Sequence, residues 1–572
     1  MRRRELWQYA LFALLLATFA LTLLYPIALT VRGGFYDDAT ARTGFTLDHV
    51  ALVFRDPVLR EGLVNALVKA VAVTLLAGVI ALPLALLSAH HRWPGKALWN
   101  ALVLVPLILP PFVGAIGLKL ILGRAGALNE LLGTDFDFLG TSRFLGVVIA
   151  EALHLYPIVY LNAAAALANL DPAMEEAAES AGAGPFTRFW RVVLPLIRPG
   201  LFAGGTIVFI WSFTELGTPL MFEWYAVTPV QIFDGITELE ASATPYALTV
   251  VMLAIAIACY LAGKFAFGRG NLAMQTRAAR AAEERPLSTP AALGATALFG
   301  FVTTLALIPH LGVVLASITA PGGWYRSVLP ERITFDHYSN ALTHDIAFPS
   351  IVNSLQFASA ATVLNVLLGL LIAYLVVRTK IKGRSVLDAL AMLPLAVPGL
   401  VLAFGFVAVS LHWPFGSGGP LSGFAGVIGA GANPIPFLIV AYAVRRLPYV
   451  VRAAAAGLEQ TSGELEEAAV NLGASTLTAV RRVIVPLIAA NLIAGGLLAF
   501  SFAMLEVSDS LILAQQAQHF PITKAIYEVS QRLGDGFGIA AAMGVWAMAL
   551  LTVALVGASV LIGKKLGAVF RV

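Results

Sequence analysis

The chain has 572 residues, of which 59% are apolar and only 12% are charged, and its formal net charge is +4. Soluble domains usually carry about a quarter charged residues, so this composition excludes an ordinary soluble protein and predicts one that faces lipid. The small, dispersed positive charge does not indicate a nucleic-acid surface. The single cysteine, Cys259, excludes an internal disulfide and a cysteine metal cluster.

Apolar runs of about 20 residues, the length that crosses a bilayer, recur along the whole sequence. We expect twelve spans and therefore an all-α integral membrane protein. The expected spans are 6–31, 64–89, 97–122, 144–168, 196–221, 246–268, 287–318, 350–377, 386–411, 424–447, 487–512 and 539–563. The first run is too long for a signal peptide and lacks a convincing cleavage site, so we expect it to be retained.

Basic residues gather in alternate loops. They precede the first span as Arg2-Arg3-Arg4 and recur at 378–384, at Arg445-Arg446 and at Lys564-Lys565. Lysine and arginine are enriched in cytoplasmic loops, so we expect these loops and both termini in the cytoplasm. The adjacent His90-His91 falls in a loop of the same side, where we expect it to be solvated.

One short pattern occurs twice between expected spans. It consists of Glu176-Ala177-Ala178, Gly182 and Val192-Val193-Leu194-Pro195, and it returns 291 residues later as Glu467-Ala468-Ala469, Gly473 and Val483-Ile484-Val485-Pro486. In each copy, helix formers followed by glycine predict a short helix that ends in a sharp turn.

The start of each short helix also has a sequence signal. Asp171-Pro172 predicts an N-cap and first helical residue for the first copy. Thr461 and Glu464 predict a capping box for the second copy. Both copies lie on the side expected to be cytoplasmic, so we interpret them as a paired docking site for a cytoplasmic partner.

The repetition extends beyond this module. Residues 45–49 correspond to 333–337 at an offset of 288, and the same offset relates Asn65 to Asn353, Gly95 to Gly383, Pro106 to Pro394 and Pro110 to Pro398. Internal repetition of this kind predicts two similar halves of six spans each. We also expect the prolines to break or kink the third and ninth spans.

The sequence therefore divides into two halves of similar length. The first half is 1–268, with its module at 171–195, and the second is 287–572, with its module at 461–486. Residues 269–286 are polar and basic, and we interpret them as a cytoplasmic linker.

Acidic residues inside spans are costly and are therefore candidates for a functional site. Glu215 and Glu506 occupy matched positions near the expected outer ends of the fifth and eleventh spans. With their polar neighbours they are our candidates for a translocation path: Glu215, Thr214, Thr218, Glu506, Ser508 and Asp509. The two carboxylates could attract a cationic substrate; the alternative is that each caps a helix end or pairs with a nearby base.

Catalytic signatures are absent from the sequence. It has no G-x-x-x-x-G-K-[ST] loop to hold phosphates, and no nucleophile triad or metal-ligand cluster. His154, near Glu151 and Tyr156, is expected to be a hydrogen-bonded core residue. We therefore expect a protein that is not an enzyme, with no cofactor and no metal in this chain.

The repeated module resembles the EAA loop of permease subunits of binding-protein-dependent ABC importers. The first copy meets the family pattern throughout, and the second departs from it only at Val485, where the family usually has leucine. The resemblance covers essentially the whole chain and implies the type I ABC importer fold. It implies that coupling helices contact a separate ATPase through Glu176, Ala177, Ala178, Gly182, Glu467, Ala468, Ala469 and Gly473.

The resemblance also implies partners and a location. Two copies of a cytoplasmic ABC ATPase would hold the ATP and Mg, and a periplasmic or extracellular solute-binding protein would deliver substrate. The chain would lie in a bacterial or archaeal inner membrane and work by alternating access. Among fused permeases it most resembles those for ferric iron, partly through the stretch 213–219, with thiamine, polyamine and phosphonate relatives close behind.

Two other classes remain as alternatives. A secondary transporter driven by an ion gradient also commonly has twelve spans in two halves, but it would need charged relay residues deep within spans. A membrane-embedded enzyme would need clustered His, Asp or Glu at catalytic or metal spacing. Neither class accounts for the paired modules.

Overall fold

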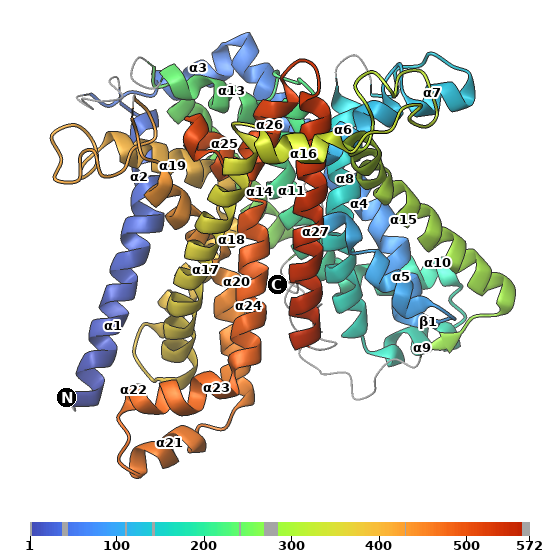
Figure 1. The fold of residues 1–572 in the computed structure, drawn as a ribbon. Helices are drawn as coiled ribbons and strands as arrows, with labels where there is room; N and C mark the ends of the chain where they lie inside the picture. Colours follow the sequence, from blue (N-terminus) through green and yellow to red (C-terminus); the bar gives the residue numbers. More distant parts are fainter. Residues whose placement is uncertain are drawn as a thin grey trace. The chain divides into compact units, whose positions relative to one another are not determined.

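The computed structural model describes residues 3–36, 44–108, 111–139, 143–238, 242–267, 284–429 and 431–562. These ranges are mostly helical, and longer loops occur at 318–335 and 412–429 (Figure 1). The long helices of the first half are α1 (Arg3–Phe19), which continues through a π-helical turn into α2 (Tyr25–Gly34), then α4 (Pro57–His90), α6 (Pro111–Leu122), α8 (Phe144–Ala168), α11 (Leu194–Phe213) and α14 (Thr244–Phe267). Those of the second half are α15 (Thr289–Ser317), α17 (Ala347–Arg378), α18 (Arg384–Ala396), α19 (Gly399–Leu411), α20 (Ile435–Gln460), α24 (Ala489–Met504) and α27 (Gly536–Ile562).

Shorter helices connect the long ones. In the first half they are α3 (Asp48–Arg55), α5 (Lys96–Leu102), α7 (Ala127–Leu132), α9 (Pro172–Ser180), α10 (Pro185–Arg188), α12 (Gly217–Met221) and α13 (Thr228–Asp234). In the second half they are α16 (Asp336–Thr343), α21 (Glu464–Asn471), α22 (Thr476–Ala479), α23 (Val485–Leu487), α25 (Ser508–Leu513) and α26 (Ile522–Ser530). Two short parallel strands, β1 (His91–Arg92) and β2 (Arg285–Pro286), pair with each other.

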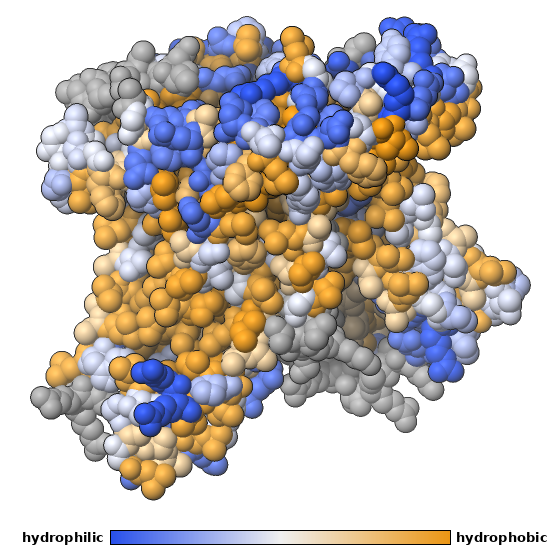
Figure 2. Space-filling model, viewed as in Figure 1, coloured by the Kyte–Doolittle hydropathy of each residue, from blue (hydrophilic) through white to orange (hydrophobic). Residues whose placement is uncertain are grey.

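Within the described ranges, nine helical segments are long and apolar enough to cross a membrane, and two bent helix pairs raise the number to eleven. Helix α20 has 26 residues, enough for a twelfth span, but it contains three arginines. Apolar side chains cover the middle of the long helices, and hydrophilic residues gather toward their ends (Figure 2). The prediction of an all-α, multi-pass membrane protein is confirmed.

One expected span is misplaced. The tenth was predicted at 424–447, but its helix, α20, begins only at Ile435 and continues to Gln460. The Asn433 side chain accepts a hydrogen bond from the Ile435 amide at 3.2 Å, and Pro434 precedes the first helical residue, so these residues start the helix late. Arginines that seemed to mark the end of a span therefore lie in the middle of a helix.

The prolines break helices where the sequence predicts it. Helices α18 and α19 together form the ninth expected span and meet at a bend of 103° next to Pro394 and Pro398. In the third expected span, a 3-10 turn that contains Pro106 separates α5 from α6. Pro110 lies outside the described residues.

Matched residues of the repeat make matched contacts. The Asn65 side chain donates a hydrogen bond to the Ala226 carbonyl at 2.7 Å. Asn353, its counterpart, donates in the same way to the Gln518 carbonyl at 3.0 Å. The sequence repeat is therefore also a structural repeat.

The internal contacts divide the chain into two compact units that do not follow the two sequence halves. One unit draws on Met1–Leu59, Gln231–Leu253 and Tyr338–Val569, and the other on Arg60–Val230 and Ala254–His337. The first span of each half, α1–α2 or α15, therefore packs in the unit that is formed mainly by the other half.

Glycines mark where these exchanged spans cross their neighbours. A Cβ on Gly405 of α19 would lie 2.9 Å from the Cβ of Pro26 in α2. In the other unit, a Cβ on Gly117 of α6 would lie 2.9 Å from the Cα of Gly312 in α15. Gly117 and Gly405 are 288 residues apart, so the repeat keeps a residue without a side chain where two helices approach closely.

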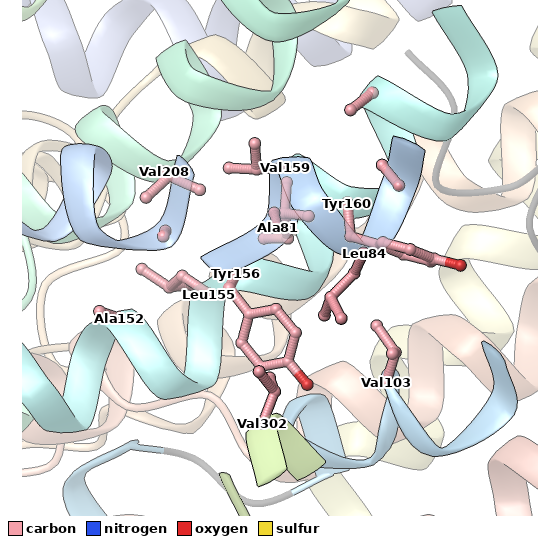
Figure 3. Packing of buried hydrophobic residues seen from close by; sticks show 14 of the residues in the cluster. Ala81, Leu84, Val103, Ala152, Leu155, Tyr156, Val159, Tyr160, Val208 and Val302 are labelled. Carbon is pink, nitrogen blue, oxygen red and sulfur yellow. The ribbon is translucent and has the colours of Figure 1, made fainter. Parts of the chain in front are cut away.

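The core of the unit that contains α4 is apolar and lies between α4, α8, α11 and α15. Figure 3 shows part of this cluster at close range. Its buried residues include Ala81, Leu84, Val103, Ala152, Leu155, Tyr156, Val159, Tyr160, Val208 and Val302. This packing holds the end of α8, after which the first module begins.

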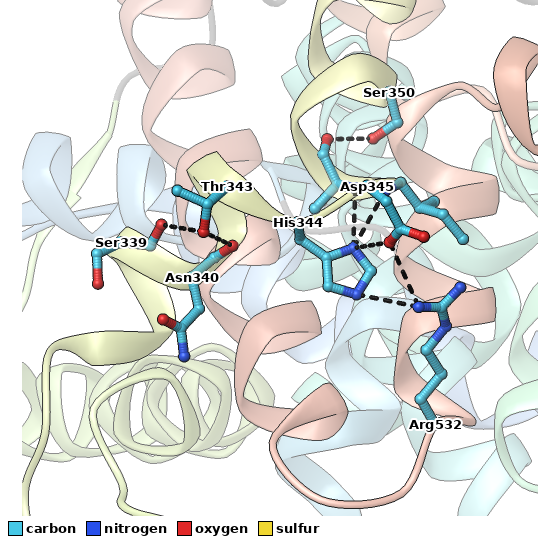
Figure 4. Close-up of polar contacts among 9 residues, drawn as sticks. Ser339, Asn340, Thr343, His344, Asp345, Ser350 and Arg532 are labelled. Carbon is cyan, nitrogen blue, oxygen red and sulfur yellow. Dashed lines mark hydrogen bonds and ion pairs between the residues drawn. The ribbon is translucent and has the colours of Figure 1, made fainter.

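Polar contacts at the two ends of α17 indicate its direction relative to the second module. At its N-terminal end, Arg532 Nη1 lies 3.4 Å from an Asp345 carboxylate oxygen and 3.2 Å from His344 Nε2 (Figure 4). At its C-terminal end, Tyr374 contacts Glu466 of the second module. A helix of 32 residues is about 48 Å long, so these two contacts belong to opposite faces of the membrane.

Candidate coupling sites and buried ion pairs

The first module is a short helix with the predicted start. In α9, the Asp171 side chain accepts a hydrogen bond from the Ala173 amide at 3.0 Å, and Pro172 is the first helical residue. Glu176 and Ala177 are exposed, and Ala178 is half-buried.

The second module forms the equivalent helix, α21. Glu467 and Ala468 are exposed, and Ala469 is half-buried. The predicted capping box is wrong, because Gly463 occupies the N-cap position without a side-chain cap. Thr461 instead accepts a hydrogen bond from Arg378 Nη2 at 2.7 Å.

The two helices end in the same turn. Gly182 and Gly473 have φ angles of +82° and +93°, in the left-handed region that favours glycine. The amide after each glycine donates to the carbonyl of the last alanine of the motif, over 2.9 Å in the first copy and 3.0 Å in the second. The repeated spacing therefore encodes one backbone structure twice.

Large apolar side chains are exposed at matched positions of the two modules. In the first copy these are Met174 and Phe186, with 51% and 76% exposure. Their counterparts 291 residues later, Leu465 and Leu477, are 47% and 77% exposed. Apolar patches bordered by polar residues are typical of surfaces that contact another protein or a membrane.

The first module is attached to α4. His90 Nε2 lies 2.9 Å from Glu175 Oε1, so the prediction that His90 is merely solvated is wrong. The hydrogen bond with His90 holds the pKa of the Glu175 carboxyl below its usual value. This contact could not be predicted from local sequence patterns, because the two residues are 85 positions apart.

The end of the expected linker also lies beside the first module. Strand β2 pairs with β1, which directly follows His90, and Arg285 Nη2 lies 3.5 Å from a Glu179 carboxylate oxygen. Arg188 forms a second ion pair with the same carboxylate. The rest of the expected linker, 269–283, lies outside the described residues.

A buried ion pair lies between α4 and α8. Lys69 Nζ is 2.9 Å from Glu151 Oε1, and both side chains are almost completely buried. Ser212 of α11 donates a hydrogen bond to the other Glu151 oxygen at 2.5 Å. Sequence reasoning missed this pair, although a lysine and a glutamate inside apolar spans were the signal.

The other unit contains its own buried charges. Glu506 is only 3% exposed, and its two carboxylate oxygens contact Arg445 and Arg446 of α20. The completely buried Asp509 has one carboxylate oxygen 3.6 Å from Arg445 Nη1. The prediction that both arginines belong to a cytoplasmic loop is wrong, since they lie within the helix.

The remaining path candidates lie where helices break. Glu215 follows α11, and its Oε1 accepts hydrogen bonds from the amide and the hydroxyl of Thr218, both at 3.3 Å. Thr214 donates to the carbonyl of Ile210 at 2.9 Å. Ser508 is the first residue of α25, directly after the break that follows α24. The part these residues play in a path stays a prediction.

His154 is half-buried, with Nδ1 2.8 Å from the carbonyl oxygen of Pro106. The contact joins α8 to the proline-containing turn that interrupts the third expected span. It agrees with the core role expected for this histidine.

A family comparison identifies the duplicated unit. The sequence profile of the family described as "Binding-protein-dependent transport system inner membrane component" matches residues 81–270 and again 365–565. The chain belongs to this family. The two matches confirm that the permease domain is present twice in one chain.

Curated relatives of this permease include two proteins of similar organisation. It is 28% identical over 537 residues to the "Ferric transport system permease protein FbpB" of Actinobacillus pleuropneumoniae, covering 91% of this chain and 73% of the relative. It is also 28% identical over 505 residues to the "Putative ferric transport system permease protein FbpB 1" of Haemophilus influenzae, covering 86% and 75%. The "Molybdenum transport system permease protein ModB" of Escherichia coli is 32% identical over 162 residues, only 28% of this chain.

Among solved structures, the permease is similar to a chain of a bacterial ABC transporter involved in the import of the acidic polysaccharide alginate. The sequence identity is 17% and the TM-score is 0.40, with 47% of this chain and 96% of that chain covered.

Proposed function

We propose that this permease is the membrane subunit of an ATP-driven importer that moves a binding-protein-delivered solute into the cytoplasm. The observation that carries the proposal is the pair of modules, which share one helix-turn structure and expose apolar residues at matched positions. Two equal surfaces on one chain suit two copies of a separate ATPase, each with its own ATP and Mg.

The proposed mechanism is alternating access. Closure of the two ATPases on ATP would move α9 and α21, the proposed coupling helices, toward each other. The spans attached to them would then expose the path to the binding protein outside the cell. Hydrolysis would return the permease to the state that opens inward.

We propose ferric iron as the solute. Relatives that match nearly the whole of this chain, both halves together, are named as ferric transport permeases. The molybdenum relative matches less than a third of the chain and so bears on one half only.

The direct test is transport by the reconstituted complex. The permease, its ATPase and its binding protein are purified together and placed in proteoliposomes, and uptake of labelled ferric iron from the binding protein is measured with and without ATP. We expect uptake that requires ATP. Uptake driven by an ion gradient without ATP would favour the secondary transporter, and ATP-driven uptake of molybdate but not iron would change the substrate within the same class.

The coupling sites are tested by charge reversal in the modules. Glu176→Lys and Glu467→Lys together should remove the ATPase from the purified complex. Glu464→Lys is the matched control, because Glu464 is exposed on α21 outside the motif. Undiminished copurification and uptake in the double variant would exclude the proposed contact.

A further inference from the structure

A glutamate directly before each motif glutamate faces the membrane helices and not the exposed side of its module. In the first copy this is Glu175, which is half-buried and contacts His90 in the last turn of α4. The other ring nitrogen of His90 lies 3.0 Å from the Leu86 carbonyl oxygen. Both nitrogens therefore face oxygen atoms, and both contacts are hydrogen bonds when the ring is the imidazolium ion.

In the second copy the corresponding glutamate also contacts the second span of its half, but its partner is a tyrosine. Glu466 is 5% exposed, and the Tyr374 hydroxyl donates a hydrogen bond to its Oε1 at 2.6 Å. One turn later in α17, Arg378 donates to the carbonyls of Leu458 and Thr461, at 2.9 Å and 2.7 Å. These bonds join α17 to the segment that leads into α21.

The two attachments occupy matched positions of the repeat. Glu175 and Glu466 are 291 residues apart, and α4 and α17 are the second spans of their halves. At the offset of 288, His90 corresponds to Arg378 and Leu86 to Tyr374. The partner side chains therefore differ, while the contact between the second span and the short helix is kept.

We propose that Glu175 and Glu466 are positioning residues that join each coupling helix to the cytoplasmic end of the second span of its half. The inference rests on the proposed function, because it assigns to these residues the transfer of ATPase motion into the membrane. A helix of eight or nine residues that is held only through its chain ends can tilt when it is pushed. A side-chain bond to α4 or α17 converts the same push into movement of a span.

The proposal assigns two different tasks to two adjacent glutamates in each module. Glu176 and Glu467 are exposed and available to the ATPase, whereas Glu175 and Glu466 point to the permease itself. Loss of an attachment should therefore leave the ATPase bound and active but less effective in driving transport.

The test compares hydrolysis and uptake in the same proteoliposomes, with the full complex of permease, ATPase and binding protein. Glu175→Ala and Glu466→Ala should each retain the ATPase, while the number of ATP molecules hydrolysed per solute imported rises about tenfold, the size of a typical coupling between sites. Glu466→Gln should restore the wild-type ratio, because the amide oxygen still accepts the Tyr374 hydrogen bond. Glu464→Ala, on the same helix and exposed, should behave as wild type.

A second pair of variants addresses misfolding. Tyr374→Phe removes a single hydroxyl, and His90→Phe keeps a ring but has no group that can donate to Glu175, so both should fold and raise the ratio in the same direction. An unchanged ratio in all of these variants overturns the proposal, and so does loss of the ATPase from the Glu175→Ala or Glu466→Ala complex. If the wild-type complex shows no ATP-dependent uptake, it is the proposed function that fails.

Discussion

The two halves place charges inside their spans with different residues. Glu151 occupies the position of Tyr442 in the repeat, and His154 occupies that of Arg445. In each half, however, a buried carboxylate forms an ion pair with a basic residue. The base is Lys69 in one unit, and two arginines take this part in the other. An unpaired charge is costly in this environment, so the repeat has kept the balance of charge and not the identity of the residues.

The pairing of buried charges affects how Glu506, one of the candidates for a translocation path, can act. Glu506, considered from the sequence as an attractive group for a cation, has both carboxylate oxygens against arginines. The alternative considered for it, pairing with a nearby base, describes its surroundings in the structure. A substrate that reached Glu506 would have to compete with two guanidinium groups.

The Lys69–Glu151 pair gives a prediction for stability. Glu151→Leu leaves a buried lysine without its partner and should lower the free energy of unfolding by about 3–5 kcal/mol. The double variant Lys69→Met with Glu151→Leu should recover most of this loss, because neither side chain then carries a charge. Thermal unfolding of the purified permease in detergent measures both effects.

An exposed ion pair serves as the control for the Lys69 and Glu151 variants. Arg124 and Asp135 form a surface ion pair at 3.4 Å, with side chains 72% and 59% exposed. Surface pairs contribute about 0–1 kcal/mol, so Asp135→Asn should have little effect. If the double variant Lys69→Met with Glu151→Leu is no more stable than Glu151→Leu alone, the unpaired lysine is not the cause of the loss.

At the scale of elements, the turn that closes each short helix depends on one glycine. A Cβ added at Gly182 or Gly473 would meet no atom within 4 Å, so substitution there changes only the backbone energy. A non-glycine residue in the left-handed conformation costs about 1–2 kcal/mol. Gly182→Ala should therefore loosen the end of α9, which hydrogen exchange of its amides would detect, and should reduce uptake.

Gly184 is the matched control for this substitution. It lies two residues further on, also with no atom near an added Cβ, but its φ of −67° suits any residue. Gly184→Ala should leave exchange and uptake unchanged. Equal effects at both positions would mean that the left-handed turn is not what the module requires.

Sequence signals that act between neighbouring residues predicted the short helices of the modules well. The features that could not be predicted depend on contacts between residues far apart in the sequence. Asp171 and Gly182 act on their own neighbours, so the start and end of α9 could be predicted from the sequence. Thr461 was expected to cap α21, but Arg378, 83 residues away, bonds to it instead. The contact of His90 with Glu175 could not be predicted for the same reason. The sequence indicates that the histidine lies near a loop, but it does not identify the distant residue that the histidine contacts.

At the scale of the whole molecule, the repeat predicted two halves, but not that they exchange their first spans. The profile matches begin at residues 81 and 365 and so leave the first span of each half outside the repeated domain. Which unit receives such a span depends on contacts such as that of Gly405 with Pro26, hundreds of residues apart. Hydropathy identifies a span but carries no information about its neighbours.

The exchange makes a prediction about divided chains. Residues 1–268 and 287–572 expressed separately should each be unstable, because each fragment lacks the exchanged first span of its compact unit, and 287–572 also lacks residues 231–253. Expressed together from two genes, they should associate and copurify in detergent. Thermal unfolding of the two fragments and of the coexpressed pair measures this, and a fragment as stable alone as in the pair would contradict it.

The exchanged first span also has a consequence for the order of synthesis. Helices α1 and α2 leave the ribosome first, yet α19, against which α2 packs, begins only at Gly399. At ordinary rates of translation this leaves α2 without α19 for roughly 20 to 70 seconds. Only 22% of its most apolar stretch is buried in the finished structure, so most of its surface suits lipid from the start. Until α19 is made, the bilayer itself can thus accommodate this span.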